Sequence, residues 1–219
     1  MSNFYQEYSK VLVSVDCIIF GFAEKSLKLL IQRRPYDPGK GELSLIGGFV
    51  RNNESVNEAA SRVLTEFTGL TDVYMQQLGV FGDVERDPGE RVISVAYYAL
   101  IDVNQYDNEL SEQHDAQWVS IDEVPDLCFD HNEMVSKAHE TLRKRMDHEP
   151  IGFNLLPRYF TLSQLQTLHE VVLGQVIDKR NFRRSVISKN LVLKTDMIDK
   201  KTSRRGAAMF EFNMGKPDE

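Results

Sequence analysis

Residues 48–70 read GFVRNNESVNEAASRVLTEFTGL, and this stretch decides how the first part of the chain folds. Ser55 and Glu58 are spaced as a capping box, in which each side chain accepts a hydrogen bond from a backbone N–H at the start of a helix. Gly69 suits the left-handed residue that commonly ends one. Between these ends the apolar residues recur at helical spacing and form one broad face: Val56, Ala59, Ala60, Val63, Leu64 and Phe67. The stretch is therefore predicted to be an amphipathic helix packed against a core.

Runs rich in β-branched and aromatic residues surround this helix and predict strands. The first two runs, Val11–Phe22 and Leu27–Arg33, are separated by a short polar turn and predict a hairpin. Three further strands and one helix complete this part of the chain: Val73–Phe81, Arg91–Ile101, Gln117–Ser120 and the helical segment Asn132–Met146. Residues 1–148 are therefore predicted to form one domain.

The last part of the chain has a different pattern. Thr161 is a good N-cap for an amphipathic helix at Leu162–Leu173, and Asp178 can cap a second helix at Lys179–Lys189. A short run at Leu191–Lys194, a basic turn at Asp199–Arg205 and the strand-like segment Ala207–Phe212 follow. Helix, turn, basic helix and basic hairpin are the layout of a winged helix-turn-helix. Residues 149–219 are predicted to form this second domain.

Five residues of the central stretch have the spacing of a Nudix box: Gly48, Glu54, Arg62, Glu66 and Gly69. Together with GELSLIGGFV before it and FGDVERDPGERVISVAYYAL after it, the stretch resembles Nudix enzymes that process ADP-ribose. The resemblance covers about residues 10–145. It implies the α+β fold class, with a Nudix α/β/α sandwich around a mixed sheet followed by the winged helix-turn-helix.

The departures from the Nudix box bear on activity. Catalytic members have an Arg-Glu pair, one apolar residue, one free position and then Glu-Glu, and these carboxylates hold a divalent metal against the pyrophosphate. Here Val63 and Phe67 replace two of the three carboxylates, and Glu66 alone remains. The sequence therefore predicts a domain that is not an enzyme, with no catalytic residues, no metal and no cofactor.

The whole chain resembles the Nudix-related bacterial transcriptional regulators, through FNLLPRYFTLSQLQTLHEVVLG, DKRNFRRSV and KKTSRRGAAMFEF in its last third. That family implies a ligand-responsive regulator, here expected to be a repressor, whose Nudix pocket binds an effector and releases operator DNA. An apolar surface at Val63 and Phe67 suits the CH face of a neutral sugar, so the favoured effector is a pentose such as arabinose. Two alternatives stay open: a regulator of NAD metabolism that senses an ADP-ribose-like ligand, and an active hydrolase of ADP-ribose-type substrates.

The effector site is expected around the box, where polar groups can orient hydroxyls and the replaced positions supply apolar contact. The candidates are Asp16, Glu42, Ser44, Val63, Glu66, Phe67, Asp83 and Arg86. Arg62 is expected to form an ion pair with Glu66 or Glu58 at helical spacing. The five histidines share no metal-ligand spacing and are expected to be surface or capping residues.

Charge is distributed unevenly along the chain. Residues 1–150 contain 14 Lys and Arg against 26 Asp and Glu, a balance of −12, whereas residues 178–205 contain ten against three, a balance of +7. A basic module attached to an acidic domain is typical of a double-stranded DNA binder. The predicted contacts are Lys179, Arg180, Asn181, Arg183, Arg184 and Ser188 in the recognition helix and Lys200, Lys201, Ser203, Arg204 and Arg205 in the wing.

Length and composition exclude several other classes of protein. The chain has 219 residues, 42% hydrophobic and 27% charged, and its apolar runs are too short to cross a membrane. The polar start MSNFYQEYSK differs from a secretory signal, and the two cysteines are expected to be reduced, so a cytoplasmic location is predicted. A homodimer is expected because regulators of this kind read palindromic sites.

Overall fold

The computed structural model describes residues 4–71, 73–103, 113–146, 154–200 and 206–213, and the structural statements below refer to these ranges. A seven-stranded mixed sheet forms the first part. Its strands are β1 (Leu12–Ala23), β2 (Ser26–Arg33), β3 (Leu43–Ser44), β4 (Ile46–Phe49), β5 (Tyr74–Phe81), β6 (Val92–Ile101) and β7 (Ala116–Ser120). The path through the sheet is β3-β2-β1-β6-β5, with β4 paired to β1 and β7 paired to β2.

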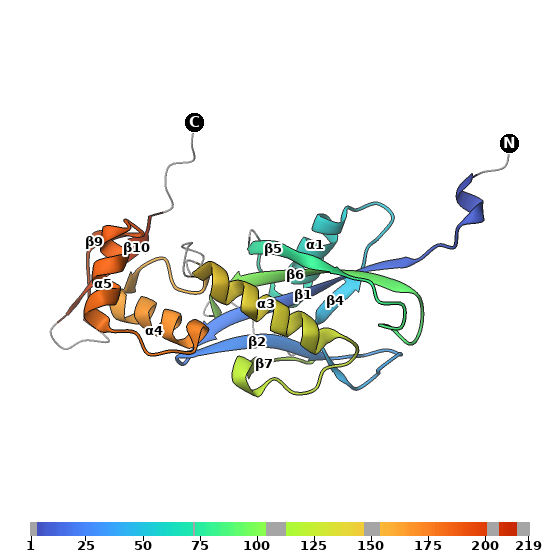
Figure 1. Ribbon diagram of the computed structural model, residues 1–219, viewed down its shortest axis with the longest axis horizontal. Helices are drawn as coiled ribbons and strands as arrows, with labels where there is room; N and C mark the ends of the chain where they lie inside the picture. The colour runs from blue at the N-terminus through green and yellow to red at the C-terminus, as the bar shows by residue number, and fades with distance from the viewer. Residues whose placement is uncertain (1–3, 72, 104–112, 147–153, 201–205, 214–219) are drawn as a thin grey trace.

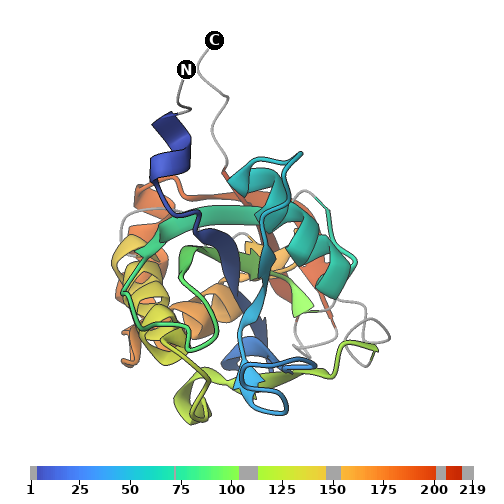
Figure 2. The same cartoon turned by 90° about the vertical axis from the view of Figure 1, so that its right-hand side faces the viewer.

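Strand β1 is central, and both of its faces are buried. It runs parallel to β6 and antiparallel to β2 and β4. Ile18 and Phe20 face the helix α3 (His131–Met146), while Cys17 and Ile19 face α1 (Val56–Thr68) on the other side. A strand covered on both faces needs a continuous apolar sequence, which explains why this run does not alternate with polar residues. Figures 1 and 2 show the two helices on opposite sides of the sheet.

The last part of the chain is a winged helix. It consists of β8 (Phe160–Thr161), α4 (Leu162–Leu173), α5 (Lys179–Ser188), β9 (Val192–Asp199) and β10 (Ala207–Phe212), with the strand order β8-β10-β9. Thr161 and Gln164 form a capping box at the start of α4, and Gly174 ends the helix in a left-handed conformation. The predicted architecture, a mixed sheet between helices followed by a winged helix-turn-helix, is confirmed.

One apolar core joins the two parts of the molecule. Helix α3 places Met134 and Ala138 against the sheet, and the same buried cluster continues through Leu142 to α4 and to Phe182 of α5. At the other end of α4, the Arg143 side chain donates a hydrogen bond of 2.8 Å to the carbonyl of Leu173. Helix α3 therefore packs on the sheet and on the winged helix at the same time (Figure 1).

Two differences from the sequence predictions concern strands: β3, β4 and β8 were not predicted, and β9 is longer than expected. Strands β3, β4 and β8 have two to four residues, too few to show a period of two. The segment expected at Leu191–Lys194 is longer, because β9 extends to Asp199, which was expected in the wing turn.

None of the helices in the described ranges is long and apolar enough to span a bilayer.

We expect Leu142→Ala to lower the free energy of unfolding by about 2–5 kcal/mol, because Leu142 is fully buried in the shared core. Urea unfolding, followed by Trp118 fluorescence and by far-ultraviolet circular dichroism, measures it. The two signals are expected to change together, since one core unfolds as a unit.

The matched control is Ser136→Ala, on the exposed side of the same helix, which should change stability by about 0.5 kcal/mol or less. Two separate transitions in the wild-type chain would contradict a shared core.

Candidate effector pocket and DNA-binding face

Helix α1 has the ends that its sequence predicts. The Ser55 hydroxyl accepts a hydrogen bond from the Glu58 N–H, and the Glu58 carboxylate accepts one from the Ser55 N–H. Gly69 closes the helix with a φ of 71°. These caps fix the start of the helix at Val56, directly after Ser55, so that Arg62 and Glu66, one turn apart, lie on the same side of α1.

Arg62 pairs with both glutamates among the five box residues, Glu54 and Glu66. Its Nε and Nη2 atoms donate to the two Glu54 oxygens at 2.9 and 2.7 Å, and Nη1 lies 3.4 Å from Glu66. The main partner of Arg62 is therefore Glu54, whereas Glu58 serves only as a cap. Hydrogen bonds from Arg62 and from the Arg51 N–H lower the pKa of Glu54 to about 2. Glu54 thus stays ionised and paired at any physiological pH.

These residues do not fit a catalytic divalent metal. Such an ion needs several oxygen ligands free to coordinate it. Glu54 is occupied by Arg62, and Glu66 lies within ion-pair distance of both Arg62 and Arg51. Across the described part of the chain, no three His, Cys, Asp or Glu side chains gather as a metal-binding cluster.

Val63 and Phe67 belong to the hydrophobic core between α1 and the sheet. Val63 is 1% exposed and lies directly beneath Gly48, where an added Cβ would meet it at 3.1 Å. Phe67 is 9% exposed, and its ring lies 4.2 Å from that of His114. These two side chains therefore pack mainly between α1 and the sheet, and only the small part that remains exposed lines a pocket.

That pocket lies between α1 and the loop after β2, and we call it the α1 pocket. Its volume is about 720 Å³, within the range of small-molecule sites. Val63, Glu66 and Phe67 line one wall, as predicted. Among the described residues of its lining, four charged side chains are cationic and two are acidic: Arg33, Arg34, Lys40 and Arg62 against Glu66 and Asp115. The pocket is therefore cationic although the domain around it is acidic.

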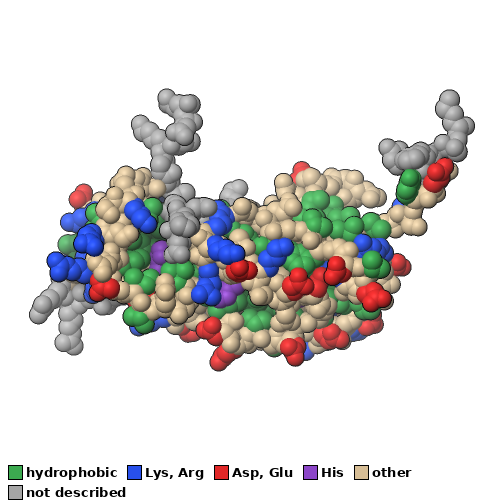
Figure 3. Space-filling model, in the orientation of Figure 1, with side chains coloured by type: hydrophobic (Ala, Val, Ile, Leu, Met, Phe, Trp, Pro, Cys, Tyr) green, Lys and Arg blue, Asp and Glu red, His purple; other side chains and the backbone are tan. Residues whose placement is uncertain are grey.

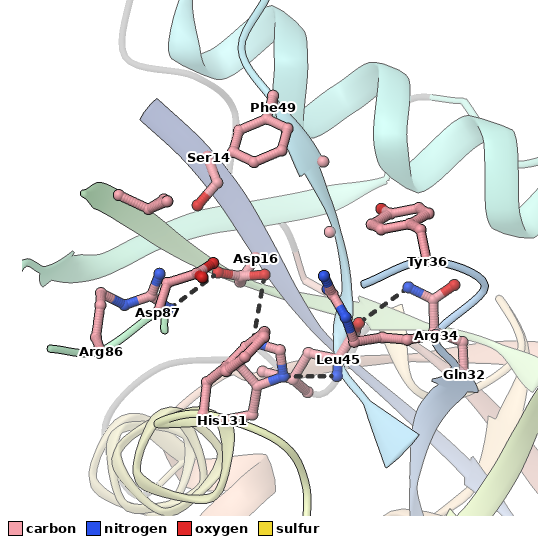
Figure 4. A pocket seen from close by; sticks show the side chains of 14 residues that line it. Ser14, Asp16, Gln32, Arg34, Tyr36, Leu45, Phe49, Arg86, Asp87 and His131 are labelled. Carbon is pink, nitrogen blue, oxygen red and sulfur yellow. Dashed lines mark hydrogen bonds and ion pairs between the residues drawn. The ribbon is translucent and has the colours of Figure 1, made fainter. Parts of the chain in front are cut away.

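A second, narrower pocket adjoins the first, and we call it the Asp16 pocket (Figure 4). The two pockets share Gln32, Arg34, Tyr36, Gly47 and Gly48 as lining residues. Gly47 is required here, because a Cβ would lie 2.4 Å from an Asp16 carboxylate oxygen. The β4 backbone can thus pass close to Asp16 only with glycine at this position.

Asp16 and Arg86, both predicted effector residues, meet in a buried polar network. Arg86 forms two hydrogen bonds of 2.7 and 2.8 Å with Asp130, and its Nη2 lies 3.6 Å from Asp16. Asp16 also accepts a hydrogen bond from Ser94 and lies 3.7 Å from His131 Nε2. Figure 4 shows Asp16 between Arg86 and His131, with Arg34 and Tyr36 on the opposite side.

Three predicted effector residues line neither pocket. The Ser44 hydroxyl is buried and donates to the Leu45 carbonyl. Glu42 is exposed in the loop before β3, and its carbonyl accepts from the Arg34 N–H. Asp83 is exposed, and its carbonyl accepts from Arg91. Ser44 therefore ends strand β3, and Glu42 and Asp83 accept backbone or side-chain hydrogen bonds within loops.

The recognition helix α5 exposes the predicted DNA-contacting side. Phe182 and Val186 are buried, and the predicted contacts are all exposed: Lys179, Arg180, Asn181, Arg183, Arg184 and Ser188. Arg184 donates a hydrogen bond of 3.2 Å to Asn181, so the two predicted base readers already lie side by side. In Figure 3, Lys and Arg side chains gather at this end of the molecule.

The wing follows β9. Lys200 is exposed at its start, whereas Lys201, Ser203, Arg204 and Arg205 lie outside the described residues. One exposed apolar residue of α5, Ile187, was not among the predicted contacts, although it is 56% exposed beside the basic residues. An apolar side chain at such a position can contact the methyl group of thymine.

Two family models match the chain: the NUDIX domain over residues 10–141 and the NrtR DNA-binding winged helix domain over residues 152–212. An ADPR responsive transcriptional repressor of Acinetobacter baylyi is 31% identical over 210 residues, which cover 94% of this chain and 84% of the relative. The chain belongs to the NrtR family.

Solved structures of NrtR have the same arrangement of domains. The crystal structure of Shewanella oneidensis NrtR complexed with a 27mer DNA has a TM-score of 0.84 and 29% identity, covering 92% of this chain and 93% of that one. The NUDIX domain of the same protein complexed with ADP ribose has a TM-score of 0.55 and 26% identity, covering 64% and 94%. A shorter relative, the ADP-ribose pyrophosphatase of Methanocaldococcus jannaschii, is 37% identical over 134 residues, 60% of this chain and 75% of the relative.

The comparisons favour the alternative, ADP-ribose-like effector over the sugar, because the relatives described above are ADPR responsive or complexed with ADP ribose. The sugar interpretation rested on Val63 and Phe67, which the fold uses mainly for packing, and no relative named here is described as binding a sugar. The cationic wall of the α1 pocket was missed. Its residues come from the sequence RRPYDPGK, which the sequence indicates only as a Pro- and Gly-rich loop. The sequence signal that could have indicated this wall is the pair Arg33 and Arg34 close to Tyr36.

His131 was also misjudged, since it is 3% exposed rather than at the surface. Its Nδ1 accepts a hydrogen bond of 3.1 Å from the Leu45 N–H, so a neutral ring has its proton on Nε2, the atom that faces Asp16. Burial lowers the pKa of His131 below its ordinary value of 6.5. The ring thus ties α3 to the short segment between β3 and β4 in its neutral form.

We expect the free energy of unfolding to fall with pH below about 6.5, because the unfolded chain then binds a proton that folded His131 does not. Above that pH the contribution of His131 is constant. In His131→Gln, which keeps an acceptor near Leu45, this decline is expected to be shallower by up to about 1.4 kcal/mol per pH unit. Urea unfolding between pH 7 and 5 measures the slope.

The control is Ser136→Ala, on the exposed side of α3, which removes no ionisable group and should keep the wild-type slope. The other buried ring with a lowered pKa, His139, is present in all three proteins, so the comparison isolates His131. Equal slopes in the three proteins would refute a neutral His131.

Proposed function

We propose that the chain is a DNA-binding transcriptional repressor whose Nudix domain senses an ADP-ribose-like ligand. The observation that carries this proposal is the similarity to the Acinetobacter baylyi repressor, which extends over 94% of the chain and so includes both domains. In this proposal residues 1–148 form the sensing domain and residues 149–219 the DNA-binding domain. NAD metabolism is the process that such an effector would report on.

The chemistry of the α1 pocket supports an anionic effector. A pyrophosphate carries negative charge, and Arg33, Arg34 and Lys40 line the pocket on the side opposite α1. Aromatic rings of Tyr36 and Phe67 lie in the same lining and suit the faces of an adenine or ribose. A neutral pentose needs neither the charge nor the volume. The proposed effector contacts include the predicted Asp16, Val63, Glu66, Phe67 and Arg86 and add these basic residues.

The proposal holds that binding takes place without turnover. With Glu54 paired to Arg62, and Val63 and Phe67 in the place of two carboxylates, the box lacks the ligands that hold the metal in catalytic members. The alternative, an active hydrolase, is favoured by the similarity to an ADP-ribose pyrophosphatase. Release of AMP from ADP-ribose in the presence of Mg²⁺, lost in Glu66→Gln, would support the alternative.

DNA recognition is assigned to α5 and the wing. Asn181 and Arg184 are proposed to read adenine and guanine, because their side chains can form two hydrogen bonds with the major-groove edges of these bases. The remaining proposed contacts position the DNA through its phosphates: Lys179, Arg180, Arg183, Ser188, Lys200, Lys201, Ser203, Arg204 and Arg205. A homodimer is proposed because two-fold symmetry matches a palindromic operator.

We expect the chain to bind a duplex covering the region upstream of its own gene, and Arg184→Gln to weaken that binding by about 1–3 kcal/mol, the value of one bidentate base contact. Fluorescence anisotropy with a labelled duplex measures the dissociation constant. Lys144→Gln is the control, since Lys144 is exposed on α3 and pairs with Glu140 at 2.6 Å. Equal affinities of both variants and the wild type would argue against base reading by Arg184.

We also expect ADP-ribose to weaken the binding of this duplex, and L-arabinose to leave it unchanged. The coupling free energy is expected to be about 1–3 kcal/mol, as for allosteric effectors in general. Arg34→Gln, which alters both pockets, should require more ADP-ribose for the same release. Arg158→Gln, which removes an exposed ion pair with Glu211, is the matched control. Release by arabinose instead of ADP-ribose would restore the sugar hypothesis.

A further inference from the structure

The hairpin turn between β1 and β2 reaches the winged helix. It borders a groove of about 620 Å³ that both parts of the molecule line. The Nudix domain contributes Phe22 and Lys25, and the winged helix contributes the first turn of α4, Lys179 and Arg183 of α5, and the start of β10. In Figure 1 the ends of β1 and β2 that form this hairpin lie beside α4.

The groove is positively charged. Lys25, Lys179 and Arg183 line it, and none of its lining residues in the described part of the chain is acidic. Within the described ranges none of these three cations has an ion-pair partner. The neighbouring acid of the turn, Glu24, is directed to Lys28 at 3.6 Å and is 85% exposed. The charge of Lys25 is therefore available to a ligand in the groove.

The turn itself holds two residues in an unfavourable backbone conformation. Ala23 pairs with Ser26, so Glu24 and Lys25 form a two-residue turn, with φ of 52° and 60°. Such turns favour Asn and Gly, because other residues cost about 1 kcal/mol or more in the left-handed region. The sequence has a lysine where glycine would be more stable. The lysine side chain lines the groove, and unfavourable backbone conformations of this kind are found mainly at functional sites.

The ligand that fits is a phosphate of the DNA backbone. Lys179 and Arg183 also belong to the exposed side of α5, so the groove continues the proposed DNA-binding face without a break. We infer that Lys25 of the Nudix domain binds a DNA phosphate together with Lys179 and Arg183, so that both domains hold the same stretch of backbone. This inference rests on the proposed function.

The shared phosphate links operator binding to the relative position of the domains. A duplex bound by both Lys25 and α5 fits only one placement of the hairpin against the winged helix. Any ligand that favours a different placement therefore weakens DNA binding by removing the Lys25 contact. This gives the Nudix domain a direct part in DNA affinity.

The test is the salt dependence of duplex binding. We expect Lys25→Gln to reduce the slope of log affinity against log salt concentration by about 0.9, the value for one phosphate contact. The ratio of wild-type to variant affinity should then rise by about threefold as salt is lowered from about 200 to about 50 mM. Lys25→Arg is expected to restore the wild-type slope.

The control is Lys10→Gln, which makes the same charge change at an exposed lysine near the N-terminal end of β1, remote from the winged helix. Anisotropy with the upstream duplex measures all four proteins, and thermal unfolding checks that each is folded. A Lys25→Gln slope equal to that of Lys10→Gln, with the wild type binding normally, would overturn this inference and leave the proposed function intact. Failure of the wild type to bind the duplex at about 50 mM salt would overturn both.

Discussion

The burial of one apolar stripe of α3 is the interaction on which the rest of the structure depends. Met134 and Ala138 cover the sheet, and Leu142 and Met146 continue the same buried cluster into the winged helix. A winged helix with only α4, α5 and three strands has little apolar surface of its own to bury. By sharing α3 with the Nudix sheet it gains a third helix, and the pocket and the DNA-binding face become parts of one packed body.

The ends and faces of the long elements could be predicted from the sequence because each depends on neighbouring residues. The capping box at Ser55 and the N-cap at Thr161 placed the starts of α1 and α4 correctly, and Gly69 placed the end of α1. The strands β3, β4 and β8 could not be predicted, since their pairing is decided by distant partners. The residues next to these strands in the sequence do not indicate which distant strands they pair with.

The candidate site was predictable only in part, for a related reason. Asp16 and Arg86 were chosen as polar residues near the box, and the fold does bring them together, through Asp130 and His131 at the start of α3. The cationic wall comes from the loop after β2, whose distance from α1 depends on how the sheet folds. Taking Val63 and Phe67 as an exposed surface led to a sugar, whereas the opposite wall favours an anion. The residues at the replaced positions of the box therefore bear on metal binding, whereas the remaining lining of the pocket bears on which ligand fits it.

The joint core also limits how such a protein can be assembled from parts during evolution. A recombination between two relatives that exchanged only the segment after α3 would set a foreign α4 against the resident Leu142 and Arg143. The mismatch would leave a void or a clash in the middle of the molecule. Proteins with this architecture should therefore inherit α3 together with the winged helix that packs on it, so that the Nudix domain and the winged helix evolve together.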